Sequence, residues 1–489
     1  MTGLAPRVAE THTGLVFLVG DLAYKLKKPV TTDFLDFSTT ASRELACAHE
    51  VMLNSRLSPA SYLGVGHFQP AQGGEPEPVI VMHRHPDEAR LATMVRRGQD
   101  VDSALEVIAA ILAGFHAGAR RGPEIDQQAR VEAVGERWRE NLDELARYAA
   151  GVVPGLDPAV VAEIRIRAMD FLAGRGALFD RRISEHRIVD GHADLLADDI
   201  FCLSAGPALL DCLEFDDRLR YVDGIDDAAF LAMDLEYLGR PDLGRLFLDA
   251  YRGRAADDAP DSLQHFYIAY RAGVRAKVDC VRHTQGDPEA PGDARRHLEI
   301  ALSHLCVGAV RLIMVGGAPG TGKTTLARGI AAELGARVIS TDDVRAAMVE
   351  RGEITGQSGV LGEGLYTREN TAAVYDAVLR QAHLALCEGR TVILDGTWHD
   401  ADYREQGRRT AAQASAPLIE LVCAASLDAT VTRIRTRTAT TSQVTPEIAT
   451  ALDGEWAWPD AHPIDTTTDP AASVAAALDI CCQPTTRST

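Results

Sequence analysis

The chain has 489 residues, and its 46% hydrophobic and 25% charged content is typical of a folded globular protein with two or three domains. Its formal net charge is −20, because 70 acidic residues outnumber 50 basic ones. The 34 basic and 48 acidic residues up to Val307, and the 16 basic and 22 acidic residues after it, make both parts acidic and argue against a nucleic-acid binder with a basic face.

The composition also argues against a membrane protein or a secreted one. No apolar run approaches the roughly 20 residues that cross a bilayer, and residues 1–14 lack the apolar core of a signal peptide. The nine cysteines have no metal-ligand spacing, which is typical of reduced thiols. We therefore expect a cytoplasmic protein.

The first part of the chain predicts a small β-rich lobe and a helix. "GLVFLVG" and "LAYKLKKPV" are two apolar runs of strand length, separated by a turn at Gly20–Asp21. "STTASRELACAHEVMLNSRL" then carries a Ser/Thr cap signal followed by apolar residues at helical spacing. "EPVIVMHRHP" predicts a further strand after a turn-like stretch.

The pattern then becomes mainly helical. Residues 101–178 predict several helices, and "PALLDCLEFDD" predicts a short strand after the loop "DGHADLLADD". Helices resume from Ala228 to Cys280 and again at residues 294–306. A β-rich lobe followed by helices indicates an α+β domain.

A different pattern begins near residue 308. The strand "VRLIMV", the glycine loop "GGAPGTGKTT" and the helix "LARGIAAELG" follow one another, and the strands "RVIST", "TVILDGT" and "LIELVCA" alternate with helical stretches. Alternating strands and helices predict an α/β domain with a parallel sheet. We expect two domains, 1–307 and 308–489.

The glycine loop matches G-x-x-x-x-G-K-[ST], the motif of P-loop NTPases. Its backbone N–H groups would surround phosphate oxygens at a helix N-terminus. Lys323 would reach the terminal phosphates, and the Thr324 hydroxyl would hold Mg²⁺. The expected ATP-binding residues are Gly317, Ala318, Pro319, Gly320, Thr321, Gly322, Lys323, Thr324 and Thr325.

Acidic residues follow two of the predicted strands in this half. Asp395 ends the apolar run "TVILD" and is the expected second acidic element, which contacts Mg²⁺. "STDDVR" places Asp342, Asp343 and Arg345 at the sheet edge where α/β proteins bind ligands, although Asp343 could instead cap the next helix.

This half resembles the small-molecule P-loop kinases, the gluconate kinase and zeta toxin relatives. The resemblance implies that Asp342 contacts the acceptor hydroxyl. It also implies lid arginines for the transferring phosphate, matched by Arg433 and Arg437 in "RIRTR". The alternative is that these arginines form a solvated helix face.

"DGHADLLADD" is close to a second phosphotransfer motif, His-x-Asp-x-x-x-x-Asn. In kinase-like folds one Asp orients the attacking hydroxyl and accepts its proton, while two oxygen ligands hold Mg²⁺. Asp194, then Asp199, and Asp211 on the next predicted strand fit that arrangement.

The whole chain resembles bacterial fusions of an aminoglycoside phosphotransferase-like domain, which has the protein-kinase fold with two lobes, and a P-loop kinase. "THTGLVFLVGDLAYKLKKP" and "LLDCLEFDDRLRYVDGIDDAAFLAMDLE" carry the resemblance. It implies Asp194 as catalytic base and Asp199 and Asp211 as metal ligands. It further implies that Lys25 or Lys27 contacts the nucleotide phosphates and that Glu50, or as a second choice Glu44, pairs with that lysine. Met82 would lie in the hinge segment 81–83, beside the nucleobase.

Two residues depart from the family pattern. Ala193 replaces the usual Gly after His192, which removes backbone freedom. Asp199 replaces Asn, which keeps a hard oxygen for Mg²⁺ but adds a charge beside Asp194 and Asp211. Without metal these carboxylates should repel one another and shift upward in pKa, so we expect strong dependence on divalent metal with either retained or reduced turnover.

We hypothesise an ATP- and Mg²⁺-dependent kinase with two nucleotide sites that phosphorylates a small hydroxyl-bearing molecule. In an alternative, the first domain is a pseudokinase that binds ligand without transferring phosphate and regulates an active P-loop kinase. A third hypothesis, action on nucleic-acid 5′ ends, is disfavoured by the acidic charge of both halves.

Overall fold

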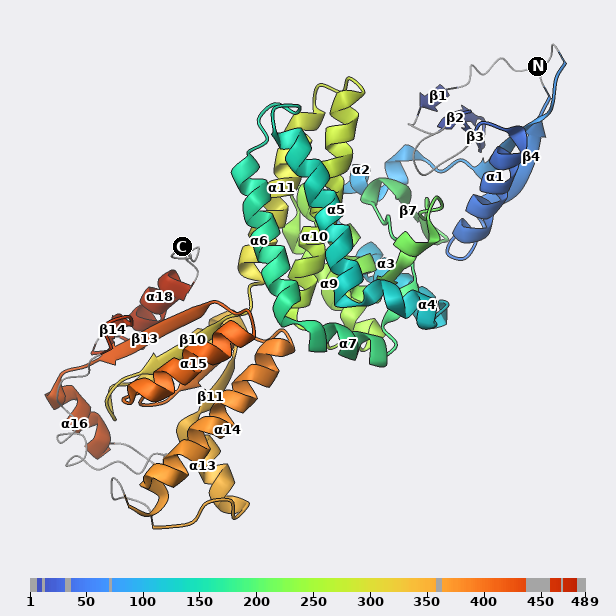
Figure 1. The fold of residues 1–489 in the computed structure, drawn as a ribbon. Coiled ribbons are helices and arrows are strands. Elements are labelled where there is room, and N and C mark those ends of the chain that lie inside the picture. Colours follow the sequence, from blue (N-terminus) through green and yellow to red (C-terminus); the bar gives the residue numbers. More distant parts are fainter. Residues whose placement is uncertain are drawn as a thin grey trace. The chain divides into compact units, whose positions relative to one another are not determined.

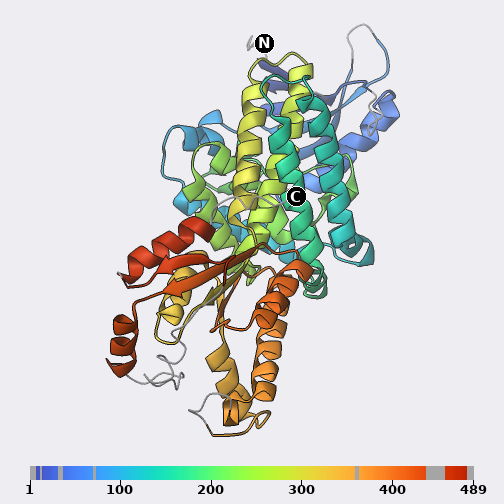
Figure 2. The ribbon, with the colours of Figure 1, turned by 60° about the vertical axis from the view of Figure 1, so that its left-hand side comes forward.

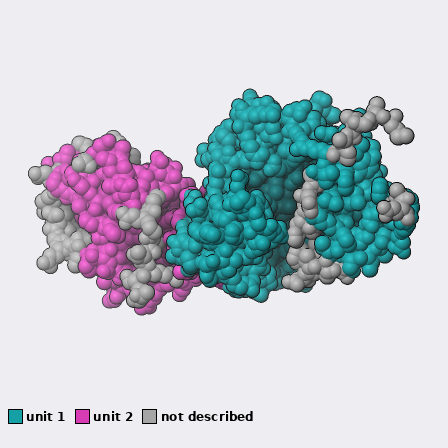
Figure 3. All heavy atoms as spheres, turned by 90° about the horizontal axis from the view of Figure 1, so that it is seen from above, with its two compact units in different colours: residues 1–162, 180–259, 267–304 teal, residues 163–179, 260–266, 305–489 magenta. Residues whose placement is uncertain are grey.

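The described residues form two compact units. The computed structural model describes residues 7–10, 14–30, 37–69, 73–357, 363–436, 458–467 and 469–481. Unit 1 contains residues 1–162, 180–259 and 267–304, and unit 2 contains residues 163–179, 260–266 and 305–489 (Figure 3). Unit 2 therefore includes two short segments that precede residue 307.

A five-stranded antiparallel sheet with the order β1-β2-β3-β5-β4 forms the small lobe of unit 1. Its strands are β1 (Arg7–Glu10), β2 (Gly14–Val19), β3 (Leu22–Lys27), β4 (Tyr62–Phe68) and β5 (Glu77–His83). The prediction of β2, β3 and β5 is confirmed. We did not predict β1, which is short and polar, or β4, which contains two glycines that weaken the strand signal.

Helix α1 (Thr40–Asn54) connects β3 to β4 and packs against β4 and β5. Thr39 caps it, because its hydroxyl accepts a hydrogen bond from the Ser42 N–H at 3.1 Å. The buried side chains recur at helical spacing and define one face: Arg43, Cys47, Glu50, Leu53 and Asn54. Glu50 therefore points from this helix toward the sheet.

Helices make up most of the large lobe (Figures 1 and 2). They are α2 (Leu91–Arg96), α3 (Asp102–Gly118), α4 (Pro123–Asp126), α5 (Val131–Ala149), α8 (Gly224–Tyr237) and α9 (Pro241–Ala255). Further helices lie partly in unit 1 and partly in unit 2: α6 (Pro158–Gly174), α7 (Gly176–Ser184), α10 (Asp261–Thr284) and α11 (Ala290–Val307). α8 is buried on nearly all sides and packs against α3 and α9, so it is the central helix of this lobe.

Two short antiparallel pairs lie where the lobes meet. β6 (Ile188–Asp190) pairs with β9 (Tyr221–Asp223), and β7 (Ile200–Leu203) pairs with β8 (Gly206–Leu209). The loop 191–199 connects β6 to β7. Phe201 and Leu210 pack in one cluster with Cys47, Tyr62 and Ile80 of the small lobe, so apolar contacts join the two lobes.

Unit 2 is built on a five-stranded parallel sheet with the order β11-β12-β10-β13-β14. The strands are β10 (Leu312–Gly316), β11 (Arg337–Ser340), β12 (Val392–Asp395), β13 (Leu418–Ala424) and β14 (His462–Asp465). The helices are α12 (Lys323–Leu334), α13 (Thr341–Glu350), α14 (Arg368–Cys387), α15 (Ala401–Gln413), α16 (Leu427–Thr436) and α18 (Pro470–Cys481). We did not predict β14. The predicted fold class, a two-lobed kinase-like α+β domain followed by an α/β P-loop domain, is confirmed.

The segments 163–179 and 260–266 contribute polar contacts to unit 2. Arg175 is 1% exposed and its Nη1 donates to the Ala414 carbonyl at 2.6 Å. The Ser262 hydroxyl donates to the Gly389 carbonyl at 2.6 Å. These bonds satisfy carbonyls at the ends of α14 and α15.

Within the described ranges no single helix is long and apolar enough to cross a membrane. Only the helices 102–118 and 123–129 taken together reach that length and composition, and the two are bent by 120° relative to each other. No disulfide joins the cysteines that the structure describes.

Candidate functional site

Lys25 on β3 lies between α1 and the segment after β8. Its Nζ is 2.8 Å from Oε1 of Glu50 and 2.6 Å from Oδ1 of Asp211. Burial alone would lower the pKa of Lys25, but the carboxylates of Asp211 and Glu50 outweigh burial and hold that pKa well above its ordinary value. A fixed positive charge therefore lies where the two lobes meet.

Lys27 shares a strand face with Lys25 but has a different second partner. Its Nζ lies 2.5 Å from Oε2 of Glu50 and 2.7 Å from Oε1 of Glu214. The Lys27 side chain is 1% exposed, whereas that of Lys25 is 15% exposed. Lys25 is thus the lysine of this pair that contacts Asp211 and remains in part accessible.

Of the two glutamates considered as the lysine's partner, the structure brings Glu50 to the lysines. Its side chain is fully buried between Lys25 and Lys27. Glu44 lies on the outside of α1, where Oε2 is 2.8 Å from Nε2 of His67 and both side chains are exposed.

Asp227 of α8, which we did not predict as a site residue, holds the loop that carries His192 and Asp194. Its Oδ2 accepts from the His192 N–H and its Oδ1 from the Ala193 N–H, both at 2.7 Å. Nε2 of His116 lies 2.9 Å from the same fully buried carboxylate. Burial alone would raise the pKa of Asp227, but the hydrogen bond and charge of His116 outweigh burial and hold that pKa below its usual range. The sequence signal for this role was the pair of adjacent acids in the otherwise apolar stretch "GIDDAAFLAM".

Ala193 adopts the left-handed conformation, with φ +67°. An L-residue there costs about 1 kcal/mol or more, which explains why glycine is usual at this position. Arg271 fixes the following peptide, because its Nη1 donates to the Ala193 carbonyl at 3.2 Å while Nε and Nη2 donate to Asp226. The surroundings therefore impose the loop conformation without a glycine.

His192 connects the loop to the segment before Asp211. Its buried ring contacts the Leu210 carbonyl through Nε2 at 3.0 Å and accepts from the Asp194 N–H through Nδ1 at 3.3 Å. Burial lowers the pKa of His192, so the ring is neutral with its proton on Nε2, the tautomer that both contacts require. Asp211 itself lies beyond the end of β8, with φ +64°, rather than on the predicted strand.

The three carboxylates of the candidate site differ in pKa. Burial raises the pKa of Asp194 to about 6, against the opposing charge of Arg275. Burial and the charges of Asp211 and Asp194 raise the pKa of Asp199 well above its usual value. The pKa of Asp211 is instead lowered, first by the charge of Lys25. Our expectation that all these carboxylates shift upward is therefore wrong for Asp211, because a lysine compensates it.

The oxygen donors of this site fit a hard divalent cation that a nucleotide brings with it. Burial and like charge disfavour the ionised form of Asp199, and a bound cation would relieve the repulsion from Asp211. In the part of the chain that the structure describes, no three His, Cys, Asp or Glu side chains already converge as a metal site. Phosphate oxygens would have to complete the coordination.

Met82, the predicted hinge residue, lies on β5 opposite Ala23 of β3. It packs against the apolar cluster that joins the lobes, which contains Ile80, Phe201 and Leu210. The structure therefore brings Met82 to the junction of the lobes, on the same sheet as Lys25.

The glycine loop of unit 2 has the backbone that its motif predicts. Gly317, Gly320 and Gly322 all have left-handed φ values, +136°, +85° and +96°. A Cβ on Gly317 would lie 2.8 Å from the Cys423 carbonyl, and one on Gly320 would lie 2.9 Å from Thr430, so side chains are excluded. Thr325 and neighbouring loop residues line a cavity of about 310 Å³ at the start of α12. This cradle fits a phosphate group.

Lys323, Thr324 and Asp395 gather beside this loop. The Thr324 hydroxyl donates to Oδ2 of Asp395 at 2.7 Å, and Nζ of Lys323 donates to the Ala318 carbonyl at 2.9 Å. Burial raises the pKa of Asp395, while the Thr324 hydrogen bond and the Lys323 charge oppose that rise. A hydroxyl and a carboxylate at the end of β12 fit the ligands that Mg²⁺ prefers.

The remaining predicted residues of unit 2 are placed as follows. Asp342, in the first turn of α13, accepts from Nη1 of Arg345 at 2.8 Å. Arg433 of α16 lines the same cavity as Lys323 and donates to the Thr466 carbonyl at 2.5 Å. Arg437 lies outside the described residues.

Comparisons with known proteins cover both parts of the chain. Residues 312–452 match the family described as an AAA domain. An uncharacterized protein of Mycobacterium tuberculosis is 55% identical over 460 residues, which cover 94% of this chain and 92% of the relative.

Solved structures also resemble each part. A choline/ethanolamine kinase family protein from Mesorhizobium loti is 14% identical and covers 62% of this chain and 92% of its own, with a TM-score of 0.38. A gluconokinase from Sinorhizobium meliloti is 19% identical and covers 35% of this chain and 91% of its own, with a TM-score of 0.27.

Proposed function

Since this chain belongs to the same family as the mycobacterial relative and carries an AAA domain, we propose that it fuses an aminoglycoside phosphotransferase-like domain to a P-loop kinase domain and is an ATP- and Mg²⁺-dependent phosphotransferase in the cytoplasm. Its acceptor is a small molecule with a hydroxyl group, and it has one nucleotide site in each unit. The fusion lies within the region shared with the mycobacterial relative, which covers 94% of the chain.

The contact that carries this proposal is Lys25 between Glu50 and Asp211. It joins residues that are far apart in the sequence, a strand lysine, a helix glutamate and an acid after β8, at 2.8 and 2.6 Å. A phosphotransferase of the kinase fold needs these three groups together, because the glutamate aims the lysine at the phosphates and the acid holds the metal.

In unit 1 the chain's own residues would act by position and charge. Asp194 accepts the proton of the acceptor hydroxyl while the hydroxyl oxygen attacks the γ-phosphorus and the bond to the β-phosphate oxygen breaks. Asp227, Arg271 and His192 hold the loop so that the Asp194 carboxylate is aligned beforehand. A pKa of about 6 leaves Asp194 ionised at neutral pH and still able to accept a proton.

Mg²⁺ would be held by Asp199 and Asp211 in unit 1 and by Thr324 and Asp395 in unit 2, where it would neutralise charge on the phosphate oxygens. In unit 2 Lys323 and the glycine loop would bind the phosphates, Asp342 would orient the acceptor, and Arg433 would stabilise the transferring group. Arg437 is proposed for the same role from the family resemblance alone.

The experiment that tests this function measures ATP consumption with a panel of sugar, polyol and aminoglycoside acceptors. The parent chain is compared with Asp194→Ala, Lys323→Ala and the double variant. Asp198→Ala is the control for unit 1, because Asp198 lies in the same loop but its carboxylate faces Arg96 at 3.3 Å with both side chains half exposed.

We expect the double variant to lose all transfer and the control to keep it. Transfer that is unchanged in Asp194→Ala for every acceptor, with ATP still bound to unit 1, would instead assign unit 1 the regulatory role. Activity that persists in the double variant would refute the proposal for both units.

A further inference from the structure

Unit 1 has a cavity of about 570 Å³ that the proposed reaction does not use. It is lined by the C-terminal half of α1, the C-terminal half of α3, Asp190 of β6 and the turn 217–220. It therefore lies on the segments that lead into the Asp194 loop.

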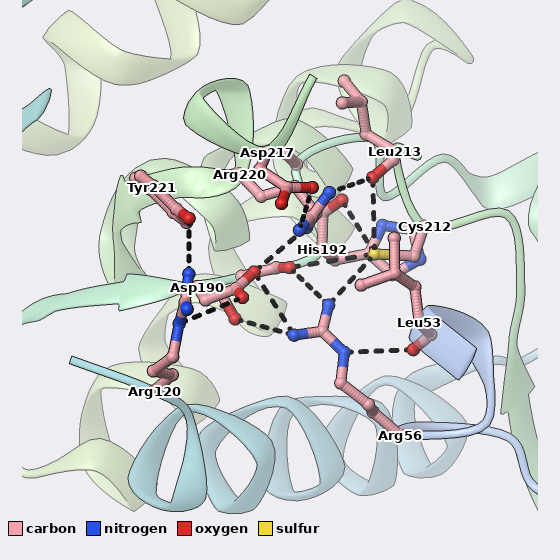
Figure 4. A network of polar contacts seen from close by, with 12 residues as sticks. Leu53, Arg56, Arg120, Asp190, His192, Cys212, Leu213, Asp217, Arg220 and Tyr221 are labelled. Atoms are coloured by element: carbon pink, nitrogen blue, oxygen red, sulfur yellow. Dashed lines mark hydrogen bonds and ion pairs between the residues drawn. The ribbon is translucent and has the colours of Figure 1, made fainter. Parts of the chain in front are cut away.

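Three guanidinium groups surround one carboxylate here. Asp190 Oδ1 is 3.0 Å from Nε of Arg220 and 3.3 Å from Nη1 of Arg56, and its Oδ2 is 3.9 Å from Nε of Arg120. Figure 4 shows Arg56 and Arg120 reaching Asp190 from two sides. Asp217 pairs with Arg220 at 2.7 Å, and Glu124 lies 3.4 Å from Arg120. The Glu124 side chain is 67% exposed, so its pairing with Arg120 is weak and Arg120 can still meet a further anion.

The cavity wall has an apolar part beside these charges. The Arg56 guanidinium lies 5.1 Å from the centre of the Phe115 ring, and Met52 on α1 is 57% exposed. An anion with an apolar body would cover this surface while its charged group meets Arg120, whose side chain is 54% exposed.

Two glycines of α3 keep the wall open. Gly114 and Gly118 are four residues apart on one helix face, both line the cavity, and a Cβ on either would meet no atom within 4 Å. A glycine inside a helix costs about 1 kcal/mol relative to alanine. Packing in the described structure does not require glycine at these two positions. Space for a ligand would explain why both residues lack a side chain.

Arg56 links the cavity to the nucleotide site. Its Nε donates to the Leu53 carbonyl of α1 at 3.0 Å, and its Nη2 donates to the Gly191 carbonyl at 3.1 Å and contacts Sγ of Cys212 at 3.3 Å. Cys212 follows Asp211, and α1 carries Glu50. A ligand that contacts Arg56 therefore acts on both segments that hold Lys25.

We propose that this cavity binds a small organic oxyanion, a phosphate or carboxylate on an apolar body, and that the bound anion strengthens ATP binding in unit 1. The effect on ATP rests on the proposed function, whereas binding of the anion does not. The negative charge of the anion would pair with the arginines. The anion would thereby hold α1 against α3 and against the loop 191–199, which keeps Lys25 aligned.

The test is calorimetric titration of the full chain carrying Lys323→Ala, which removes the phosphate site of unit 2. The probes are phenyl phosphate, benzoate and inorganic phosphate, which separate the two head groups and the apolar body. We expect phenyl phosphate or benzoate to bind with one site and to bind more tightly than inorganic phosphate.

Two added substitutions should each weaken that binding at least tenfold. Arg120→Gln removes the exposed guanidinium, and Gly114→Leu fills the cavity from a position where an added Cβ meets no atom within 4 Å. Arg139→Gln is the matched control, because Arg139 is 48% exposed and pairs with Glu136 on α5. Gly253→Leu is the control for the glycine, since Gly253 is also helical, exposed and open. Thermal unfolding checks that every variant is folded.

Absence of binding for all three probes would refute the proposed oxyanion site. Binding that is unchanged in both Arg120→Gln and Gly114→Leu would refute it as well. The coupling is measured by repeating the ATP titration with saturating probe, and linkage requires that ATP and probe strengthen each other by the same factor. An unchanged ATP affinity would overturn the coupling, while failure of ATP to bind at all would count against the proposed function and leave the oxyanion site standing.

Discussion

The substitution Glu50→Gln should destabilise unit 1 and weaken its ATP binding. Glu50 is fully buried and contacts Lys25 at 2.8 Å and Lys27 at 2.5 Å. At an effective dielectric constant of ~20, unit charges at such distances attract by about 6 kcal/mol before desolvation is subtracted. Removal of one partner from a buried ion pair costs about 3 to 5 kcal/mol. We expect about 3 kcal/mol here, because Lys25 keeps Asp211 and Lys27 keeps Glu214.

Differential scanning calorimetry of the full chain measures this loss. A cost of about 3 kcal/mol corresponds to a fall in Tm on the order of 10 °C for a domain of this size. Glu44→Gln on the same helix is the control and should shift Tm very little, since its contact with His67 is exposed. Titration of ATP into Glu50→Gln in the Lys323→Ala background should show an affinity at least tenfold lower. Equal shifts for both variants, or an unchanged Tm for Glu50→Gln, would refute the idea that Glu50 clamps the lysines.

Three further predictions concern the two sites. Activity of unit 1, measured in the Lys323→Ala chain, should rise with pH through about 6, because the pKa of Asp194 is raised and its carboxylate accepts a proton only when ionised; a flat profile from pH 5 to 8 would contradict this. Asp199→Asn removes a neighbouring negative charge, so the midpoint of that profile should move to lower pH and the Mg²⁺ concentration for half-maximal rate should rise several-fold; a midpoint that moves upward would count against the electrostatic account. In equilibrium titrations Thr324→Ala should weaken Mg²⁺-dependent nucleotide binding to unit 2 by about tenfold or more, whereas loss of ATP binding from unit 1 in the same variant would contradict two separate sites.

The motifs that can be predicted from the sequence are those whose residues all lie within one short stretch of the chain. The glycine loop is such a motif, because its left-handed residues and the following helix are encoded within one stretch. The strands β2, β3 and β5 were predictable for the same reason, since each is a continuous apolar run. β14 pairs with β13 although 37 residues separate the two strands, and such a pairing leaves no local signal.

The choice between Lys25 and Lys27 needed the structure. The two residues share a strand face, so period-2 alternation treats them alike. They differ only in their second partner, Asp211 or Glu214, which follow β8 far along the chain. The opposite pKa shifts of Asp199 and Asp211 arise from the same long-range contact, because Lys25 lies against Asp211.

Asp227 shows a further limit. An acid in an apolar helix can be an exposed exception or a buried anchor, and the pattern of residues does not distinguish them. Its role follows from two backbone N–H groups of a loop 34 and 35 residues away, which only the fold brings to its carboxylate.

The two segments 163–179 and 260–266 have a consequence for how the gene can be divided. A truncated gene that begins at codon 308 would encode the P-loop half without Arg175 and Ser262, and the carbonyls of Ala414 and Gly389 would lose their donors. The stacked rings of Phe171 and Phe266, 4.4 Å apart, would be lost with them. Recombination that exchanges only the second half for an unrelated P-loop kinase would leave the same partners behind. The contacts that complete the P-loop half therefore come in part from segments encoded before codon 308.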